Sequence, residues 1–371
     1  MRPRVADLAP RSAASRTRTA LIWSAALALA AILLYYSLRG TDWPRVGELF
    51  VAARWGFVAT SAAVASLSIF LRAIRWRLLL NAEGAVSVRT AFWATCAGYF
   101  GNNFLPVRGG EVVRTLMISS QSSLTTAYVF TTALSERAVD AVALVAISAL
   151  VLLTLPSPPG WLATAARPFA VLGILAVVTI AALPACEPLI RRFVGQLRFS
   201  QKASIALMQI LERVLRAFRA FHDTRRLITF VSLTAVIWTL DAVATVIGAH
   251  ALGFSIPINV AFLLIAGLGL GSALPSTPGY VGIYQFVAVT VLQPFGFTRT
   301  DAIAYILFAQ ALSYLLIALW GSIGFVQYRK LSDKSPLSAS TAEPSMGELP
   351  SFVDGKPRTA GDEYNSRARN E

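Results

Sequence analysis

The sequence predicts an all-α, polytopic membrane protein with about six full spans plus two re-entrant helical hairpins in an inverted repeat. Hydrophobic residues make up 56% of the chain and charged residues only 14%, against about 25% charged in soluble domains. Charge is confined to a few stretches, with long apolar runs between them. Two apolar regions, Val88–Ser120 and Ile258–Phe295, are broken in the same way, by Leu-Pro and then glycine.

Full spans are predicted where apolar runs approach the length of about 20 residues that a bilayer requires. These runs are Ala20–Leu38, Trp55–Phe70, Val139–Leu155, Pro168–Ala185, Leu227–Ala249 and Ala302–Tyr328. The first run follows a basic segment, so a cleaved signal peptide is the alternative. Its length and the lack of an A-x-A-like site after Leu38 favour an uncleaved span.

Basic residues orient these spans, because they are retained on the cytoplasmic side. The N-terminal tail (1–19), the basic loop between the halves (186–226) and the tail 329–371 are therefore predicted to be cytoplasmic. The arginines that close the second span are placed on the same side: Arg72, Arg75 and Arg77. The loop is either an amphipathic helix on the membrane surface or an ordinary basic loop. The tail 329–371, rich in Ser, Pro and mixed charge, is predicted to be disordered.

The two broken regions must each begin and end on one side, the first on the cytoplasmic side and the second on the outer side. Two short spans in each region would satisfy the same orientation, but the polar character of Gly110–Gln121 favours hairpins. A broken helix persists in lipid only where protein or a wet cavity satisfies its backbone. Corresponding breaks in two halves indicate a binding site between them. The residues at the breaks are Asn102, Asn103, Pro106, Gly109, Gly110, Pro275, Pro278 and Gly279.

The first hairpin carries a charged cluster, Arg108, Glu111 and Arg114. Glu111 and Arg114 are three residues apart and can pair on one helical face. If Gly109–Gly110 begins a helix, its free amides and the two guanidinium groups suit an anion such as phosphate. The alternative is an internally neutralised structural pair near the interface.

A second charged cluster, Glu136, Arg137 and Asp140, is expected at the start of the third full span. The spacing places Arg137 and Asp140 together, with Glu136 one turn from Asp140. The cluster either faces the first hairpin across a polar cavity or forms a salt-bridged cap at the interface. Because it is net acidic and the first cluster is net basic, a mutual pairing network is predicted.

The second hairpin offers neutral groups, among them Tyr280, Tyr284 and Gln285, which could hold a polar headgroup. The nearby glycines Gly267 and Gly271 indicate close helix packing, and a nucleotide motif is disfavoured without a preceding strand. Asp241 is a lone acid in the middle of the fifth span and a candidate proton-coupling or pore-facing group.

Several functional classes are disfavoured. The chain has two cysteines and no Cys/His cluster, so neither disulfides nor a metal site are predicted. No catalytic constellation is present, and we expect neither an enzyme nor a cofactor. The net charge of +14 follows the positive-inside rule, so nucleic acid is not an expected partner.

Four ordered motifs carry a family resemblance: RAIRWRLLL (Arg72–Leu80), NNFLPVRGGEVVR (Asn102–Arg114), SERAVD (Ser135–Asp140) and PSTPGYVGIYQ (Pro275–Gln285). Over Ala20–Tyr328 the chain resembles the lysylphosphatidylglycerol synthase/flippase transmembrane family, including its UPF0104-type membrane proteins. The resemblance implies a bacterial or archaeal integral membrane protein with a flippase-like domain, associated with moving modified lipids or glycolipids. Some members carry a fused transferase domain that this sequence does not show, so synthase activity is not expected. The family's second motif often ends in glutamate where this chain has Gln285.

The resulting functional hypothesis is a flippase-like protein of the bacterial cytoplasmic membrane, with both termini cytoplasmic. It would bind or move an anionic phospholipid or glycolipid headgroup between leaflets, with membrane lipids as its partners. One alternative is a non-transporting scaffold or regulator of an envelope-lipid enzyme, acting through the loop 186–226. A weaker alternative is a membrane-embedded glycosyltransferase.

Overall fold

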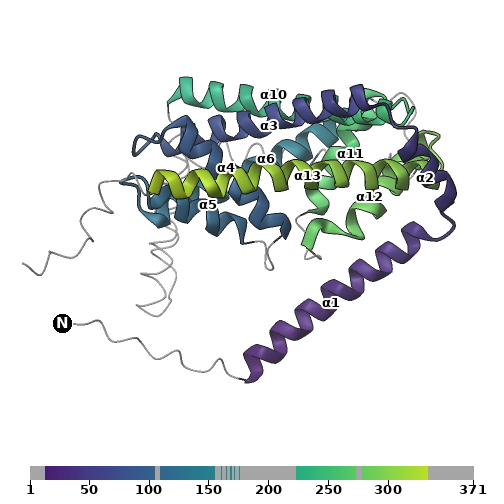
Figure 1. Cartoon of the computed structure of the whole chain (residues 1–371), viewed down its shortest axis with the longest axis horizontal. Helices are drawn as coiled ribbons and strands as arrows, with labels where there is room; N and C mark the ends of the chain where they lie inside the picture. Colours follow the sequence, from purple (N-terminus) through teal and green to yellow (C-terminus); the bar gives the residue numbers. More distant parts are fainter. Residues whose placement is uncertain are drawn as a thin grey trace, which may run out of the picture. The chain divides into compact units, whose positions relative to one another are not determined.

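The computed structural model describes residues 13–104, 109–154, 223–272 and 278–332, together with the single positions 160, 164, 168, 171 and 175 (Figure 1). Within these residues every regular element is a helix, which confirms the all-α prediction. The chain divides into two compact units, Met1–Tyr328 and Arg329–Glu371. Some predicted segments and residues lie outside the described residues. They are most of the span Pro168–Ala185, the basic loop as far as residue 222, the C-terminal tail from residue 333, and Pro106, Arg108 and Pro275.

Four described helices are long and apolar enough to cross a membrane. They are α3 (Trp55–Leu80), α6 (Thr126–Thr154), α10 (Thr224–Ala251) and α13 (Arg299–Ser332). Each contains one predicted run, except that the run in α6 was predicted to end one residue later, at Leu155. The first predicted run falls in α1 (Ala13–Leu38), which is followed by the short helix α2 (Trp43–Val51). The total number of spans and their inverted orientation stay predictions.

Two of these helices extend past the predicted spans into charged sequence. Helix α3 continues from Phe70 to Leu80 through its arginines, and α6 begins at Thr126 rather than Val139. The cluster Glu136–Asp140 therefore lies in the body of α6, and its expected position at the start of a membrane span stays a prediction. Ion pairing explains both extensions, because a helix can carry charge inside a bundle when the charge is neutralised by a neighbour.

The first broken region folds as two helices, α4 (Val88–Phe104) and α5 (Gly110–Ser119), which pack against each other. At 17 and 10 residues, the arms are about 25 and 15 Å long, shorter than a bilayer's hydrocarbon core. A Cβ on Gly101 would lie 2.8 Å from the Gly110 Cα, and one on Gly98 would lie 3.1 Å from the Arg114 Cβ. Glycine thus allows the two backbones to approach closely.

The second broken region repeats this design with α11 (Ile258–Gly271), the 3₁₀ turn η3 (Pro278–Tyr280) and α12 (Ile283–Leu292), which is extended by η4 (Gln293–Phe295). A Cβ on Gly267 would lie 2.9 Å from Val287, and one on Gly271 would lie 2.9 Å from Ile283. Both glycines therefore face α12, and their predicted role in helix packing is confirmed.

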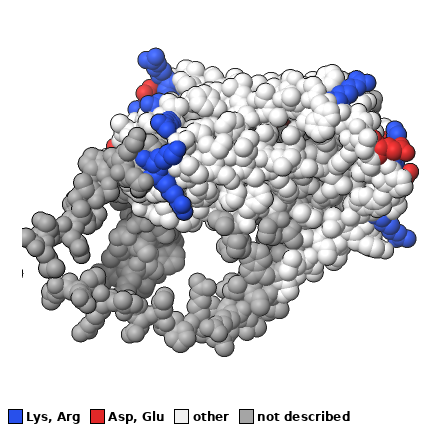
Figure 2. All heavy atoms as spheres, viewed as in Figure 1, with Lys and Arg blue, Asp and Glu red and all other residues white. Residues whose placement is uncertain are grey.

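The hairpins share one bundle with the long helices. In Figure 1, α10 runs beside α3, and these two helices are in contact along the bundle. The end of α4 contacts η3, so the two breaks approach each other. Helix α1 packs on α12, where Ala30 lies against Gly282. Figure 2 shows charged side chains at the two ends of the described helices and an uncharged band between them, as expected for a bundle that crosses lipid.

We predict that Gly101→Ala lowers the stability of the purified protein by about 1–3 kcal/mol, because the added methyl group would press on the Gly110 backbone. Gly47→Ala in α2 is the matched control, since a Cβ there meets no atom within 4 Å. Thermal unfolding in detergent measures both variants. Equal melting temperatures for the two would contradict the close approach of α4 and α5.

Candidate functional site

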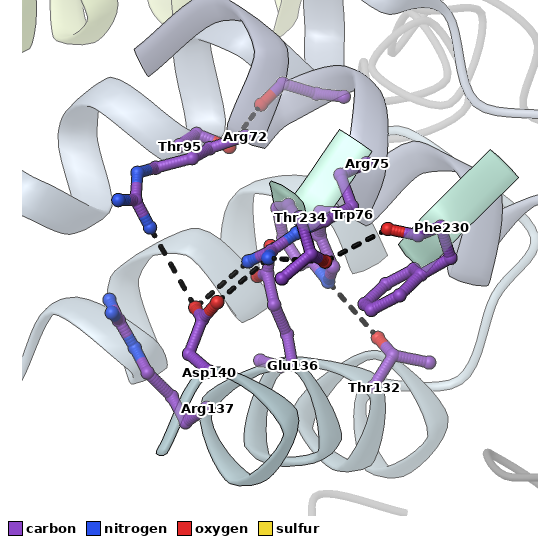
Figure 3. A network of polar contacts seen from close by, with 12 residues as sticks. Arg72, Arg75, Trp76, Thr95, Thr132, Glu136, Arg137, Asp140, Phe230 and Thr234 are labelled. Carbon is purple, nitrogen blue, oxygen red and sulfur yellow. Dashed lines mark hydrogen bonds and ion pairs between the residues drawn. The ribbon is translucent and has the colours of Figure 1, made fainter. Parts of the chain in front are cut away.

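The centre of the bundle is a network of buried ion pairs built around Arg75 of α3 (Figure 3). Arg75 is fully buried and donates from Nη1 to Asp140 Oδ1 at 2.7 Å and from Nη2 to Asp140 Oδ2 at 2.8 Å. Its Nη2 also donates to Glu136 Oε1 at 3.0 Å, and Nη1 donates to Thr234 of α10 at 3.0 Å. One arginine therefore connects α3, α6 and α10.

Glu136 extends the network to the first hairpin. Its second oxygen, Oε2, accepts from Arg114 Nη1 at 2.9 Å, and Arg114 Nε pairs with Glu111 Oε2 at 2.5 Å. The pairing of Glu111 with Arg114 predicted from their spacing is thus confirmed. Arg114 Nη2 donates to the Ala133 carbonyl, and the guanidinium lies over Trp76. Because all three nitrogens of buried Arg114 are engaged, its role is to position the hairpin.

Arg137 pairs differently from the prediction. Its Nε donates to Glu111 Oε1 at 2.9 Å, and no ion pair with Asp140 is present among the described residues. The expected pairing of Arg137 with Asp140 is wrong, because Arg75 from α3 already holds both Asp140 oxygens. The predicted network between the two clusters is nevertheless confirmed by the pairs Arg114–Glu136 and Arg137–Glu111.

Asp241 of α10 is paired, so its description as a lone acid is wrong. It accepts from Ser68 Oγ at 2.5 Å and forms an ion pair with Arg72 of α3. Arg72 also lies 3.7 Å from Asp140 and over the ring of Trp238. Sequence reasoning assigned Arg72 and Arg75 to the cytoplasmic boundary and missed this role. The sequence signal that could have revealed this role is the i, i+3 spacing of Arg72 and Arg75, which places both side chains on one helical face.

Among the described residues the network is electrically balanced. These residues contribute four arginines and four acids, which are Arg72, Arg75, Arg114, Arg137, Glu111, Glu136, Asp140 and Asp241. Balance is required because an unpaired charge in a low-dielectric interior costs several kcal/mol. No group of three or more His, Cys, Asp or Glu side chains in the described part of the chain is arranged to hold a metal ion.

A cavity of about 660 Å³ lies beside the network, within the range typical of small-molecule sites. Its charged lining residues are Arg72, Glu111, Arg137, Asp140 and Asp241, and its aromatic ones are Tyr99, Trp238, Tyr280, Tyr284, Tyr305, Phe308 and Tyr314. Both hairpins thus contribute to a single concave site within the bundle.

The turn of the first hairpin lines this cavity with Asn102 and Asn103. Helix α5 begins at Gly110, as predicted, but its first amide donates to Asn102 Oδ1 at 3.0 Å. The Asn102 amide group also donates to Glu111 Oε1 at 3.3 Å. Asn102 and Glu111 therefore occupy the start of α5, where the sequence suggested an anion.

In the second hairpin, Tyr280 and Tyr284 line the cavity and stack with their ring centroids 4.9 Å apart. Gln285 is buried behind Gln310, which lines the cavity. It accepts from the Gly282 amide at 2.7 Å and donates to Gln310 Oε1 at 2.5 Å, and Gln310 donates to the Gly279 carbonyl. Gln285 thus fixes the turn, where Gly279 has a φ of +75°.

A family model described as the lysylphosphatidylglycerol synthase TM region matches residues 23–321. The chain is 27% identical to glycosyltransferase AglD of Haloferax volcanii, over 71% of this chain and 46% of that protein, so it spans about half the length of this relative. It is 26% identical to the UPF0104 membrane protein PH1989 of Pyrococcus horikoshii, over 77% of this chain and 91% of the relative. A UPF0104 membrane protein of Methanothermobacter thermautotrophicus is 25% identical, over 74% of this chain and 84% of the relative. No solved structure matches.

We predict that Arg75→Ala destabilises the protein by about 3–5 kcal/mol, because Asp140 and Glu136 lose a buried cation. Arg45→Ala is the control, since Arg45 forms a solvent-exposed pair with Glu48 and its loss is expected to cost less than about 1 kcal/mol. Chemical unfolding in detergent reports both changes. A loss for Arg75→Ala no larger than the control's would refute the central role of this arginine.

Proposed function

The chain belongs to the lysylphosphatidylglycerol synthase TM region family, and we propose that it is a flippase-like carrier of an anionic lipid headgroup. The headgroup, from a phospholipid or glycolipid, would occupy the cavity between the hairpins while its acyl chains stay in the bilayer. As a multi-pass membrane protein, it would act in the bacterial cytoplasmic membrane with both termini in the cytoplasm.

The observation that carries this proposal is the exposure and hydrogen bonding of the Arg137 side chain. Its side chain is 40% exposed, lines the cavity and uses only Nε in the network. No hydrogen bond from its Nη1 or Nη2 to another described residue is present. A planar guanidinium with two donors directed at a cavity is suited to a phosphate group.

The surroundings of Arg137 support the same ligand chemistry. Figure 3 shows the guanidinium groups of Arg72 and Arg137 pointing into the same space beside Asp140. The tyrosines that line the cavity add neutral hydrogen-bonding groups for a glycerol or sugar moiety. An apolar exterior around a polar cavity would let a lipid present its headgroup inward.

The name of one relative, glycosyltransferase AglD, favours a membrane-embedded glycosyltransferase as a second candidate. We rank it below transport, because the match covers 46% of that protein and the charged residues that the structure describes around the cavity pair with one another. A scaffold role through the basic loop would leave the cavity without a ligand.

We predict that Arg137→Gln slows translocation of fluorescently labelled phosphatidylglycerol about tenfold or more in proteoliposomes, because a charge-assisted hydrogen bond to phosphate is lost. Chemical quenching of label in the outer leaflet measures the rate. Arg45→Gln, at an exposed site, is expected to behave as wild type.

Protein-free vesicles set the background rate in this experiment. A wild-type rate at that background would reject lipid transport and favour the scaffold. Transfer of labelled sugar to lipid, with no leaflet movement, would favour the glycosyltransferase. Equal rates for Arg137→Gln and wild type would remove Arg137 from the site.

A further inference from the structure

We propose that binding of the anionic headgroup is coupled to uptake of one proton by Asp241, with Arg72 as the residue that changes partner. This inference rests on the function proposed above. It explains how the site compensates for the negative charge that a bound headgroup would bring.

Arg72 lies between two carboxylates on different helices. Its Nη2 pairs with Asp241 Oδ2 of α10, and its Nη1 lies 3.7 Å from Asp140 Oδ2 of α6. All three side chains line the cavity, so the pair Arg72–Asp241 is directly accessible to a ligand there. Arg72, like Arg137, is therefore a paired arginine that an entering phosphate can reach.

The two carboxylates depend on Arg72 to different degrees. Asp140 keeps two short hydrogen bonds from Arg75 when Arg72 moves away. Asp241 has Arg72 as its one ion-pair partner among the described residues, and its other contact is the neutral hydroxyl of Ser68. Loss of Arg72 thus leaves Asp241, and not Asp140, without a cation.

An uncompensated carboxylate inside the bundle is unstable in its ionised form. When phosphate takes the Arg72 guanidinium, Asp241 loses its paired cation and stands beside a new anion, and both conditions favour the neutral acid. Arg72 keeps its protons, and a proton from water joins a carboxylate oxygen of Asp241. The phosphate brings one negative charge and the proton one positive charge, so the network stays balanced.

Several other titratable groups lie near Asp241. Those that share the cavity or pack nearby are Asp140 and Arg137 of α6, Glu111 of α5, Tyr99 of α4, Tyr280 and Tyr284 of the second hairpin, and Tyr305 and Tyr314 of α13. Arg137 and Glu111 are paired with each other, and the Tyr305 hydroxyl donates to the Thr245 carbonyl at 3.2 Å. Helix α11, which packs on α10, carries no titratable residue. On α10 itself, His250 is more than two turns away.

The test measures proton uptake when dioctanoyl phosphatidylglycerol binds to the purified full-length protein in weakly buffered detergent solution with a pH indicator. The phosphodiester of this probe stays ionised near neutral pH. We expect about one proton per bound molecule, and an affinity that rises up to about tenfold per unit fall in pH.

Asp241→Asn mimics the protonated acid, and the oxygen of the asparagine amide can still accept the hydrogen bond from Ser68. We expect it to bind the probe with an affinity independent of pH and without proton uptake. Arg72→Gln gives a second variant, in which no cation is left to change partner, so any remaining binding should take up no proton. Asp301→Asn, at an exposed N-terminal turn of α13, should match wild type.

The outcomes separate the two proposals. Probe binding by wild type without proton uptake overturns the coupling and leaves the lipid-binding function standing. Proton uptake that persists in Asp241→Asn or Arg72→Gln also overturns the assignment, because the proton then goes elsewhere. No probe binding by wild type overturns both proposals.

Discussion

Charge balance inside an apolar bundle is the constraint on which this structure depends. Arg75 is fully buried, and the desolvation of its charge is offset because α6 supplies two carboxylates and α10 supplies a hydroxyl. Glu136 is shared with Arg114, which joins α5 to the same network. These side chains fix how four helices meet, since a shift of any one of them would leave a charge unpaired. The network thereby fixes the position of the cavity, because the helices that it joins also line the cavity.

The two hairpins meet a second constraint, which concerns the backbone. A broken helix exposes amides and carbonyls that lipid cannot satisfy. Asn102 serves the first break by accepting from the Gly110 amide. Gln285 and Gln310 serve the second by binding the Gly282 amide and the Gly279 carbonyl. Glycines on α4 and α11 then let each pair of arms close. Similar breaks are thus stabilised by different side chains.

Sequence alone predicted features that depend on local spacing and composition. The helical fold followed from apolar runs, and the pair Glu111–Arg114 followed from an i, i+3 spacing. Contacts between distant segments were not accessible in this way. Arg137 was assigned to Asp140 because nothing local shows that Arg75, 65 residues earlier, takes that carboxylate. Arg72 and Arg75 were assigned to the membrane boundary because the positive-inside rule already accounted for them. Gln285 resembled a ligand contact, but its partner Gln310 lies on another helix.

Burial divides the arginines of the network into structural and ligand-facing members. Side-chain exposure is 0% for Arg75 and 4% for Arg114, but 12% for Arg72 and 40% for Arg137. Exchanging a partner costs most where water and alternative donors are absent, so the first two are confined to positioning roles. The last two face the cavity, where an incoming anion can replace a carboxylate. Because the described network is already neutral, the proposed anionic headgroup would have to bring or attract a compensating positive charge. Under that proposal, the site would select for the total charge of its contents as well as for headgroup shape.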